Sequence, residues 1–193
     1  MINVKPKCES HVQQGEVFRD IYMIGDVTEE QGILEVGRIS FPYVMVLTQE
    51  CDLEEDFRLR STNSAETKLD KLLLSVLVAP LYNADHLKKG THLSELDING
   101  DSIDSKRWNH VTNNVMPRFH YLEFPKITKL IPLVIDFKHY FSVNIEYLKR
   151  VREERYITTV AELFRERISQ RFANYLSRIG LPDANKKKPL PNK

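Results

Sequence analysis

Six short runs rich in β-branched and aromatic residues constrain the fold of this 193-residue chain more than any other feature. Several are bounded by Gly or Pro, and this is the pattern of β-strands separated by turns. The runs cover residues 15–26, 33–41, 42–47, 71–82, 115–124 and 130–143. Because they are joined mostly in sequence, we expect a small, strongly curved antiparallel sheet or barrel.

The run that begins at Phe41 changes character abruptly. It opens with the apolar letters FPYVMVL and closes with five carboxylates within residues 50–56. An apolar run without alternation is typical of a central strand that is covered on both faces. We therefore expect residues 41–52 to form an interior strand that carries Cys51 and Asp52 to the rim of a barrel.

Polar segments separate the apolar runs. Residues 53–70 are expected to form a short irregular helix or flap, and Gly37 is expected to mark a β-bulge. Residues 83–114 are polar and contain the turn signal Asn99-Gly100. We expect them to form a long excursion with one or two short helical pieces.

The clearest single element is a helix over residues 159–179. Thr159 followed by Glu162 predicts a capping box, and Gly180 supplies a stop signal. The apolar residues recur at helical spacing and form one stripe, which predicts that the helix packs against the sheet. The stripe consists of Val160, Phe164, Ile168, Phe172, Leu176 and Ile179. The segment 181–193 is basic and is expected to be disordered, so residues 1–180 form the predicted domain.

The formal net charge of +1 hides an asymmetry. Residues 1–148 carry 16 Lys and Arg against 22 Asp and Glu, a net charge of −6, and residues 149–193 carry 12 against 5, a net charge of +7. A basic segment beside an acidic body either binds nucleic acid or docks on its own body. We favour pairing between the helical arginines and the acidic residues 50–56.

The composition favours a protein of the cytoplasm. No apolar run approaches the roughly 20 residues that a membrane span requires, and the first residues lack the apolar core of a secretory signal. The two cysteines, Cys8 and Cys51, are too few for a disulfide scaffold and fit a reducing compartment. We therefore expect no membrane association.

The first half of the chain resembles PemK/MazF-like proteins in the order of its landmarks. These are GEVF, then EEQG, then FPYVMVLTQECD, and then LLLSVLVAPL, all within residues 15–82. The resemblance implies an SH3-like β-barrel, to which the C-terminal helix and the excursion would be additions. It also implies a sequence-selective endoribonuclease of a toxin–antitoxin pair that cuts RNA without a metal, by internal attack of the 2′-hydroxyl.

The catalytic arginine of that family has no direct counterpart in this chain. The family places it directly before the proline of the buried strand, where this sequence has Phe41. The nearest arginine is Arg38, three residues earlier, and an odd offset on a strand points to the opposite face unless a bulge intervenes.

Cys51 and Asp52 allow two interpretations. In one, Cys51 is a small buried residue and Asp52 makes a turn at a strand end. In the other, Cys51 is a nucleophile and Asp52 orients a histidine, although the neighbouring carboxylates disfavour a reactive thiolate. The chain contains no His/Cys spacing typical of a zinc site, and we predict no metal or cofactor.

A second candidate site is the segment KRWNHVTNNVMPRFHY, residues 106–121. It interleaves cations and aromatic rings with amides and imidazoles, and single-stranded RNA is recognised by this mixture. The residues that would contact RNA are Lys106, Arg107, Trp108 and His110, together with Arg38 from the barrel. The alternative is a barrel strand whose aromatic residues enter the core.

Our prediction is phosphodiester cleavage with His120 as the acid or base and Arg118 as the phosphate stabiliser. Asp52 would partner a histidine, whereas His139 lies on an apolar strand face and is interpreted as a hydrogen-bonded core residue. Partners would be single-stranded RNA, an antitoxin or defence-system subunit, or a second copy of the chain. The alternatives are a non-catalytic barrel that acts as a binding or regulatory subunit, and a thiol-dependent hydrolase or transferase centred on Cys51.

Overall fold

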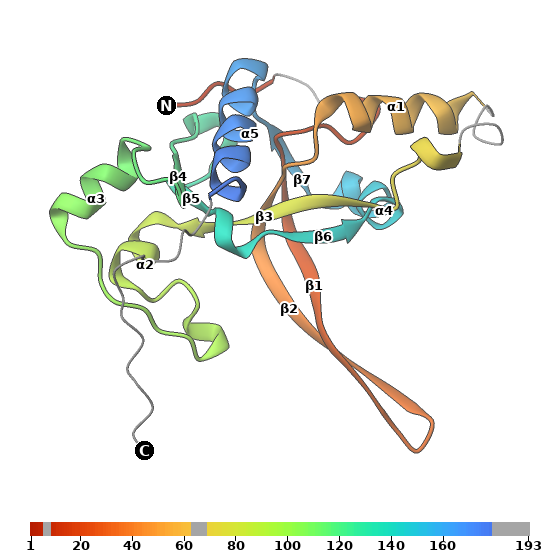
Figure 1. Cartoon of the computed structure of the whole chain (residues 1–193), viewed down its shortest axis with the longest axis horizontal. Coiled ribbons are helices and arrows are strands. Elements are labelled where there is room, and N and C mark those ends of the chain that lie inside the picture. Colours follow the sequence, from red (N-terminus) through yellow and green to blue (C-terminus); the bar gives the residue numbers. More distant parts are fainter. Residues whose placement is uncertain (6–8, 63–68, 179–193) are drawn as a thin grey trace, which may run out of the picture.

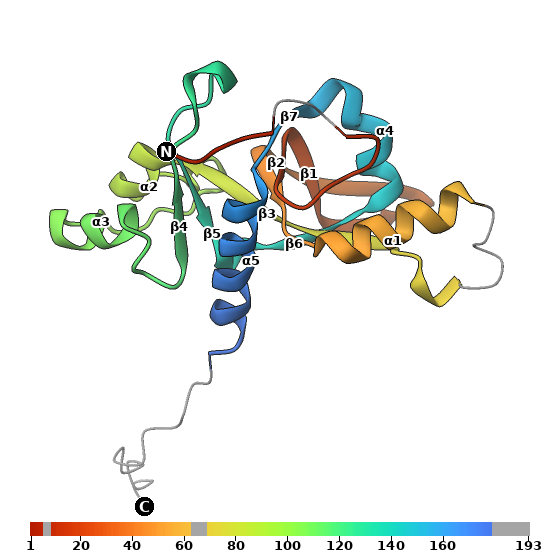
Figure 2. The same ribbon diagram turned by 90° about the horizontal axis from the view of Figure 1, so that it is seen from above.

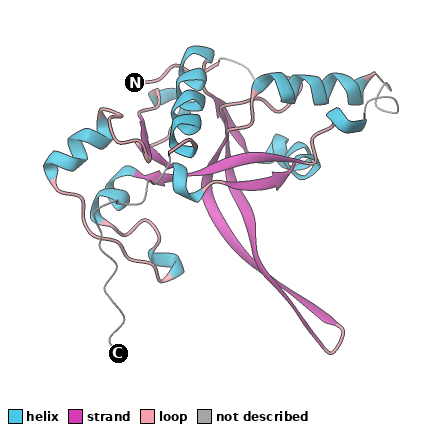
Figure 3. Ribbon diagram, in the orientation of Figure 1, coloured by secondary structure: helices cyan, strands magenta, loops and turns pink. Residues whose placement is uncertain are grey.

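The computed structural model describes residues 1–5, 9–62 and 69–178, and it consists of one antiparallel sheet with helices packed around it (Figures 1 and 3). This confirms the prediction of a mainly β fold with α additions. The strands are β1 (Glu16–Glu30), β2 (Ile33–Val46), β3 (Ser75–Asn83), β4 (Phe119–Leu122), β5 (Leu133–Asp136), β6 (Phe141–Asn144) and β7 (Tyr156–Thr159). The α-helices are α1 (Glu50–Ser61), α2 (Ala84–Lys89), α3 (Ser105–Thr112), α4 (Ile145–Arg155) and α5 (Glu162–Leu176), and short 3₁₀ turns occupy Leu69–Lys71, Ser94–Leu96, Lys126–Thr128 and Phe137–His139.

The strand order is β4-β5-β3-β2-β1-β7, with β6 also paired to β3. β5 and β6 form one interrupted strand along a single edge of β3. From the pair Leu81↔Ile135 to the pair Val78↔Phe141, β3 advances three residues and its partner six, so three residues of the partner are extra. The interruption falls beside Pro80, which has no N–H to donate to a neighbouring strand.

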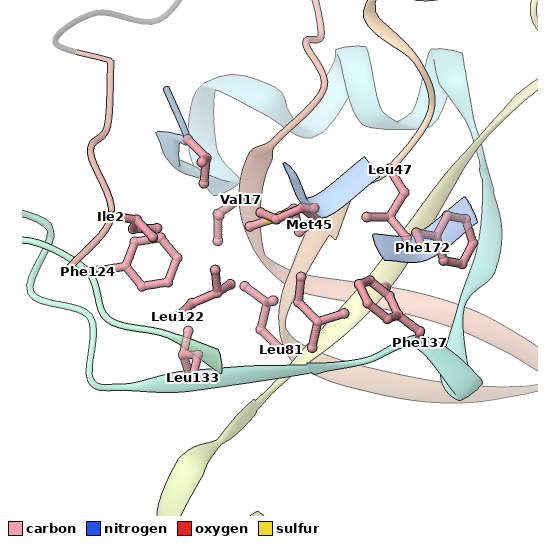
Figure 4. Packing of buried hydrophobic residues seen from close by; sticks show 14 residues of the cluster. Ile2, Val17, Met45, Leu47, Leu81, Leu122, Phe124, Leu133, Phe137 and Phe172 are labelled. Carbon is pink, nitrogen blue, oxygen red and sulfur yellow. The ribbon is translucent and has the colours of Figure 1, made fainter. Parts of the chain in front are cut away.

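The sheet has β4 and β7 as its outer strands. The N-terminal segment runs between these two sides of the molecule (Figure 2). Ile2 donates its N–H to the carbonyl of Glu123, and Lys5 donates to the carbonyl of Thr159, both at 2.8 Å. Beside β7, Ala161 also donates to the carbonyl of Asn3, so Val4 and Val160 form an isolated antiparallel bridge. Ile2 enters the core beside Phe124 (Figure 4).

β1 and β2 are longer than predicted and form a hairpin that extends well beyond the rest of the sheet (Figure 1). In the segment VTEEQG, residues 27–32, β1 continues through Glu30. Only Gln31 and Gly32 form the turn, and both have positive φ, 52° and 80°, as a two-residue hairpin loop requires. The predicted bulge lies on the strand opposite Gly37. Between the pairs Ile24↔Arg38 and Val27↔Val36, β1 contains one residue more than β2.

The prediction that residues 41–52 form one strand is wrong. β2 ends at Val46, and α1 begins at Glu50. The ladder to β3 stops because the N–H of Leu77 is bound at 2.7 Å by the hydroxyl oxygen of Thr48 and not by a backbone carbonyl. Carboxylates in the first turn then favour the helix, since they face its positive end. The helix expected within residues 53–70 therefore exists but starts earlier.

Hydrophobic clusters cover both faces of the sheet. On one face, α5 contributes Ile168 and Phe172 to a cluster with Met45, Leu133 and Phe137 (Figure 4). On the other face, α1 and α4 bring residues such as Leu53 and Leu148 against β2, β3 and β6. The α5 stripe is confirmed for Phe164, Ile168 and Phe172. Val160 is buried but precedes the helix in a bridge with Val4, Leu176 is exposed, and Ile179 lies outside the described residues.

The capping box predicted at Thr159 is wrong. Thr159 closes β7, and α5 begins three residues later at Glu162, with Ala161 as the N-cap and no side-chain capping bond. α4 and β7 were not predicted. The start of α4 has an ordinary cap, because the Asn144 side chain accepts from the backbone N–H groups of Glu146 and Tyr147. The stop signal at Gly180 and the tail 181–193 lie outside the described residues.

The predicted pairing of the helical arginines with residues 50–56 is found for one arginine of α5, and a lysine of α4 makes a similar contact. Arg165 of α5 lies 3.0 Å from Glu50, and Lys149 of α4 lies 3.2 Å from Asp56. Basic helices late in the chain therefore neutralise acidic residues of the body.

The excursion 83–114 contains α2 and α3, in agreement with the two short helical pieces expected there. Its helices pack on β4 and β5 through a small cluster that includes Leu87, Val111 and Phe119. Gly90 ends α2 with φ of 76° and accepts a hydrogen bond from the N–H of Gly100 at 2.9 Å.

Candidate functional site

A buried carboxylate, Asp136 at the end of β5, organises the strongest candidate site. Its side chain is fully buried, and the Arg118 guanidinium donates to both of its oxygens, with Nη2 at 2.6 Å and Nε at 2.8 and 3.1 Å. The backbone N–H of Lys138 also donates to it at 3.0 Å. A bidentate guanidinium and a backbone donor are the partners that a buried carboxylate needs.

The strand interruption brings His139 to the same carboxylate. Residues 137–139 form a single 3₁₀ turn, in which side chains three residues apart eclipse one another. His139 Nδ1 consequently lies 3.5 Å from Asp136 Oδ2. On an uninterrupted strand the two side chains would point to opposite faces.

Tyr82 of β3 and His92 of the excursion complete the cluster. The Tyr82 hydroxyl lies 3.0 Å from His139 Nδ1, and the Tyr82 ring makes edge-to-face contacts with both His92 and His139. Neither ring nitrogen of His92 has a hydrogen-bond partner among the described residues. Tyr82 and His92 also line a cavity of about 260 Å³ that opens beside β2.

The electrostatics of the cluster keep both imidazoles neutral. Burial lowers the pKa of His139, and the nearby Arg118 and Lys138 lower it further, although Asp136 opposes them. Burial likewise lowers the pKa of His92. The pKa of the Tyr82 hydroxyl is raised by burial and by the charge of Asp136, so the phenol stays protonated.

The cluster can be reached from solvent. The Arg118 side chain is 38% exposed and that of His139 is 24% exposed, whereas the carboxylate between them is not exposed at all. Two aromatic rings adjoin the site: Tyr140 is exposed and packs edge-to-face on Phe172, and Tyr175 lies 6.0 Å from Phe137.

Two further cations lie at this opening. Lys138 is exposed, and the Arg178 guanidinium stacks over the Tyr175 ring at 3.8 Å. The region therefore combines cations and flat rings around an imidazole, as was expected of residues 106–121.

His120 does not belong to this site. It points to the other face of the sheet, where it contacts Phe137 and lies under α5. Burial lowers the pKa of His120 to about 3, and the charges of Arg171 and Arg167 add to the effect. The pairing of His120 with Arg118 in one catalytic centre is therefore wrong, because the strand directs the imidazole into the core.

Cys51 and Asp52 lie exposed in the first turn of α1 and not on a barrel rim. The Cys51 sulfur lies 3.7 Å from Gln49 Oε1 and 3.8 Å from Asp52 Oδ1, so its neighbours are oxygens. Neither contact supplies the base that a cysteine nucleophile requires. Cys8 lies outside the described residues.

The other predicted RNA contacts fall in two separate places. Lys106, Arg107 and His110 are exposed on α3, and Trp108 is half-buried against Tyr121 with Lys88 above its ring. Arg38 lies on the β1–β2 hairpin, paired across the ladder with Ile24. The structure does not gather them at Asp136.

Two more buried carboxylates serve to hold helices. Glu16 pairs with Arg152 of α4, and Asp56 of α1 accepts from Arg60, Lys149 and the backbone N–H of Leu73. Asp136 differs from both because its neighbours include imidazoles and a phenol, which are groups that can transfer protons.

One grouping has metal-ligand character. Single ligand atoms of His11, Glu50 and Glu54 lie within 4.8 Å of one another. The carboxylate of Glu50 is already used, since it accepts from the N–H of Gln14 at 2.7 Å and lies 3.0 Å from Arg165. We therefore assign this group to the anchoring of α5.

No family model, curated protein or solved structure matches this chain. Within the described residues, none of the helices has the length and apolar character needed to cross a membrane. Function is therefore inferred from the geometry of the site.

Proposed function

We propose that this chain binds single-stranded RNA at the Asp136 site and cleaves it by attack of the ribose 2′-hydroxyl on the adjacent phosphate. The observation that carries the proposal is one buried carboxylate that holds a guanidinium and an imidazole side by side, each partly open to solvent. Phosphodiester transfer of this kind needs a proton acceptor and a cation, and both are present.

His139 is the proposed base. The carboxylate 3.5 Å from Nδ1 favours the tautomer with the proton on Nδ1; the Tyr82 hydroxyl oxygen then accepts at 3.0 Å, and Nε2 is left as the acceptor. The lowered pKa keeps the ring neutral at pH 7, and a base must be neutral to accept a proton. The 2′-oxygen then forms a bond to phosphorus, the bond from phosphorus to the 5′-oxygen breaks, and the departing oxygen takes a proton from the imidazolium or from water.

Arg118 is the proposed phosphate stabiliser. Its Nε and Nη2 are engaged by Asp136, and the N–H groups of Nη1 are available to a phosphate oxygen. Asp136 acts as a positioning residue for both groups. Tyr140 and Tyr175 offer rings on which bases can stack, and Lys138 and Arg178 offer charge for the flanking phosphates.

The landmarks shared with PemK/MazF-like proteins support the same proposal. They favour an SH3-like barrel as the ancestor of the sheet, and a toxin–antitoxin or phage-defence setting in the bacterial cytoplasm. Phe41 stands where that family has its arginine, so in our proposal Arg118 supplies the missing cation from a different strand.

The test is cleavage of fluorescent single-stranded RNA by the purified chain, with and without EDTA, with detection of the 2′,3′-cyclic phosphate. We expect His139→Gln to lower kcat/KM by about 10²- to 10⁴-fold, the range for loss of a general base. Cys51→Ala and His120→Gln are matched controls and should retain activity. Activity that survives His139→Gln, or failure of the wild type both to cleave RNA and to bind it, overturns the proposal.

A non-catalytic binding subunit is the second candidate, and one observation favours it. The β1–β2 hairpin carries exposed apolar residues far from the Asp136 site, as a surface made for a protein partner does. This interpretation predicts a wild type that neither binds nor cuts RNA and that retains its fold.

A further inference from the structure

The free part of the β1–β2 hairpin, residues 22–40, is a two-stranded ribbon that projects from the body (Figure 1). We call this segment the arm. Isolated two-stranded ribbons are marginally stable in water, so an arm of this length is expected to be covered in its working state. Its residues are almost all exposed in the single chain.

The arm has one apolar face. Alternation along β2 places Leu34, Val36 and Arg38 on the same side, and cross-strand partners share a side. The exposed apolar residues of this face, with exposed fractions between 38% and 67%, are Tyr22, Ile24, Val27, Leu34 and Val36. The outer half of the opposite face carries Thr28, Glu30 and Glu35, with Ile33 beside the turn.

Charge divides the arm along its length. The outer half carries the carboxylates Asp26, Glu29, Glu30 and Glu35, whereas Arg38 lies toward the body. At the base of the arm, Arg38 and Arg150 line a cavity of about 910 Å³ together with Tyr22, Ile24 and Val143. Arg155 lies above the Tyr22 ring, 5.3 Å from its centre.

We propose that two copies of this chain pair through the apolar faces of their arms, in antiparallel orientation about a two-fold axis. In this arrangement the acidic outer half of each arm lies against the arginines at the foot of the other arm. The same face is buried on both copies, as an isologous interface requires. A nucleic acid is a poor occupant because its phosphates would meet the acidic outer half.

The size of the arm indicates that its outer end enters the cavity. With a rise of about 3.4 Å per residue, the arm is roughly 30 Å long and one face is roughly 10 Å wide. That face is smaller than the about 800 Å² per partner of a stable complex. Entry of the outer end into the cavity at the base adds contact with Val143 and Arg150 of the other copy and extends the interface onto the body.

The test is the molar mass of the purified full chain, measured by sedimentation velocity across a range of micromolar concentrations. We expect a dimer for the wild type and a dissociation constant at least about 100-fold weaker for Val27→Lys, because the lysine would be buried without a partner. Thr28→Lys is the matched control. It adds the same charge at the neighbouring position on the other face and should leave the dimer intact.

A charge exchange tests the orientation. Glu29→Arg and Arg38→Glu should each weaken the dimer, and the double variant should recover most of the affinity. Circular dichroism checks the fold of each variant, which is expected to persist because these residues are exposed. A monomeric wild type, or equal behaviour of Val27→Lys and Thr28→Lys, overturns the proposal. RNA cleavage is measured separately, so either proposal can fail alone.

Discussion

Arg118 and Asp136 form a bidentate ion pair in which the carboxylate is fully buried and the guanidinium is 38% exposed. The free-energy cost of leaving one partner unpaired therefore differs between the two residues. A guanidinium at this depth can be hydrated, whereas the carboxylate cannot reach water.

Substitution of the pair should be asymmetric. Arg118→Met leaves a buried carboxylate with only the Lys138 N–H and the His139 ring, and we expect a loss of about 3–5 kcal/mol in the free energy of unfolding. Asp136→Asn should lose only about 1–2 kcal/mol, because the amide oxygen can still accept a hydrogen bond. Urea unfolding of both variants and of the double variant measures the coupling, and a larger loss for Asp136→Asn would contradict the assignment.

Gly90 and Gly32 provide a second comparison. Both have positive φ, 76° and 80°, so alanine at either position should lose about 1–2 kcal/mol from backbone strain. A Cβ at Gly90 would also lie 2.2 Å from the carbonyl oxygen of Gly100, whereas a Cβ at Gly32 would meet nothing within 4 Å. We therefore expect Gly90→Ala to be at least about 2 kcal/mol worse than Gly32→Ala in thermal or urea unfolding. Equal losses would show that residues 83–114 shift to accommodate the added Cβ without a cost in stability.

His120 should make the protein less stable in acid. Its pKa is about 3 in the folded chain against an ordinary value of 6.5, so the unfolded chain binds the proton more readily as the pH falls below 6.5. Between pH 7 and pH 4.5 this group alone should remove about 2–3 kcal/mol of stability.

The measurement is the difference in unfolding free energy between the wild type and His120→Gln at several pH values. The other titrating groups contribute equally to both proteins and cancel. We expect the wild type to lose stability relative to His120→Gln as the pH falls. Parallel pH profiles would place the imidazole in water and contradict its burial.

Arg165 contacts two carboxylates that differ in their exposure to solvent. It lies 3.0 Å from Glu50, whose side chain is 11% exposed, and 3.5 Å from Glu166, which is 65% exposed. Glu50→Gln should lose about 3 kcal/mol, because a mostly buried guanidinium loses its counter-charge. Glu166→Gln should change stability by less than about 0.5 kcal/mol, as surface pairs do. Similar losses for both would mean that α5 is not anchored through Glu50.

Features fixed by local patterns were predictable from the sequence. The start of β1, the apolar run of β3 and the α5 stripe of Phe164, Ile168 and Phe172 all follow from periodicity. The limit of β2 was not predictable in this way. It depends on Thr48 binding Leu77 and on Glu50 binding Gln14, and both contacts join residues about thirty or more positions apart.

The candidate site was predicted only in part. Arg118 was predicted to stabilise a phosphate beside His120, but the side chain that it contacts is Asp136. The spacing of Asp136 and His139 is visible in the sequence, yet it brings the two together only when a 3₁₀ turn replaces the strand. Pro80, on the neighbouring strand, was the one available signal for that interruption.

The three additional residues between β5 and β6 carry His139 but are not needed for the pairing of either strand with β3. A shortened chain without residues 137–139 would join the two strands in the register that each already has with β3, so the sheet would persist while the imidazole vanished. Segment length at this one point would thus distinguish relatives that retain the proposed proton acceptor from those that keep the architecture alone, before any of them is assayed.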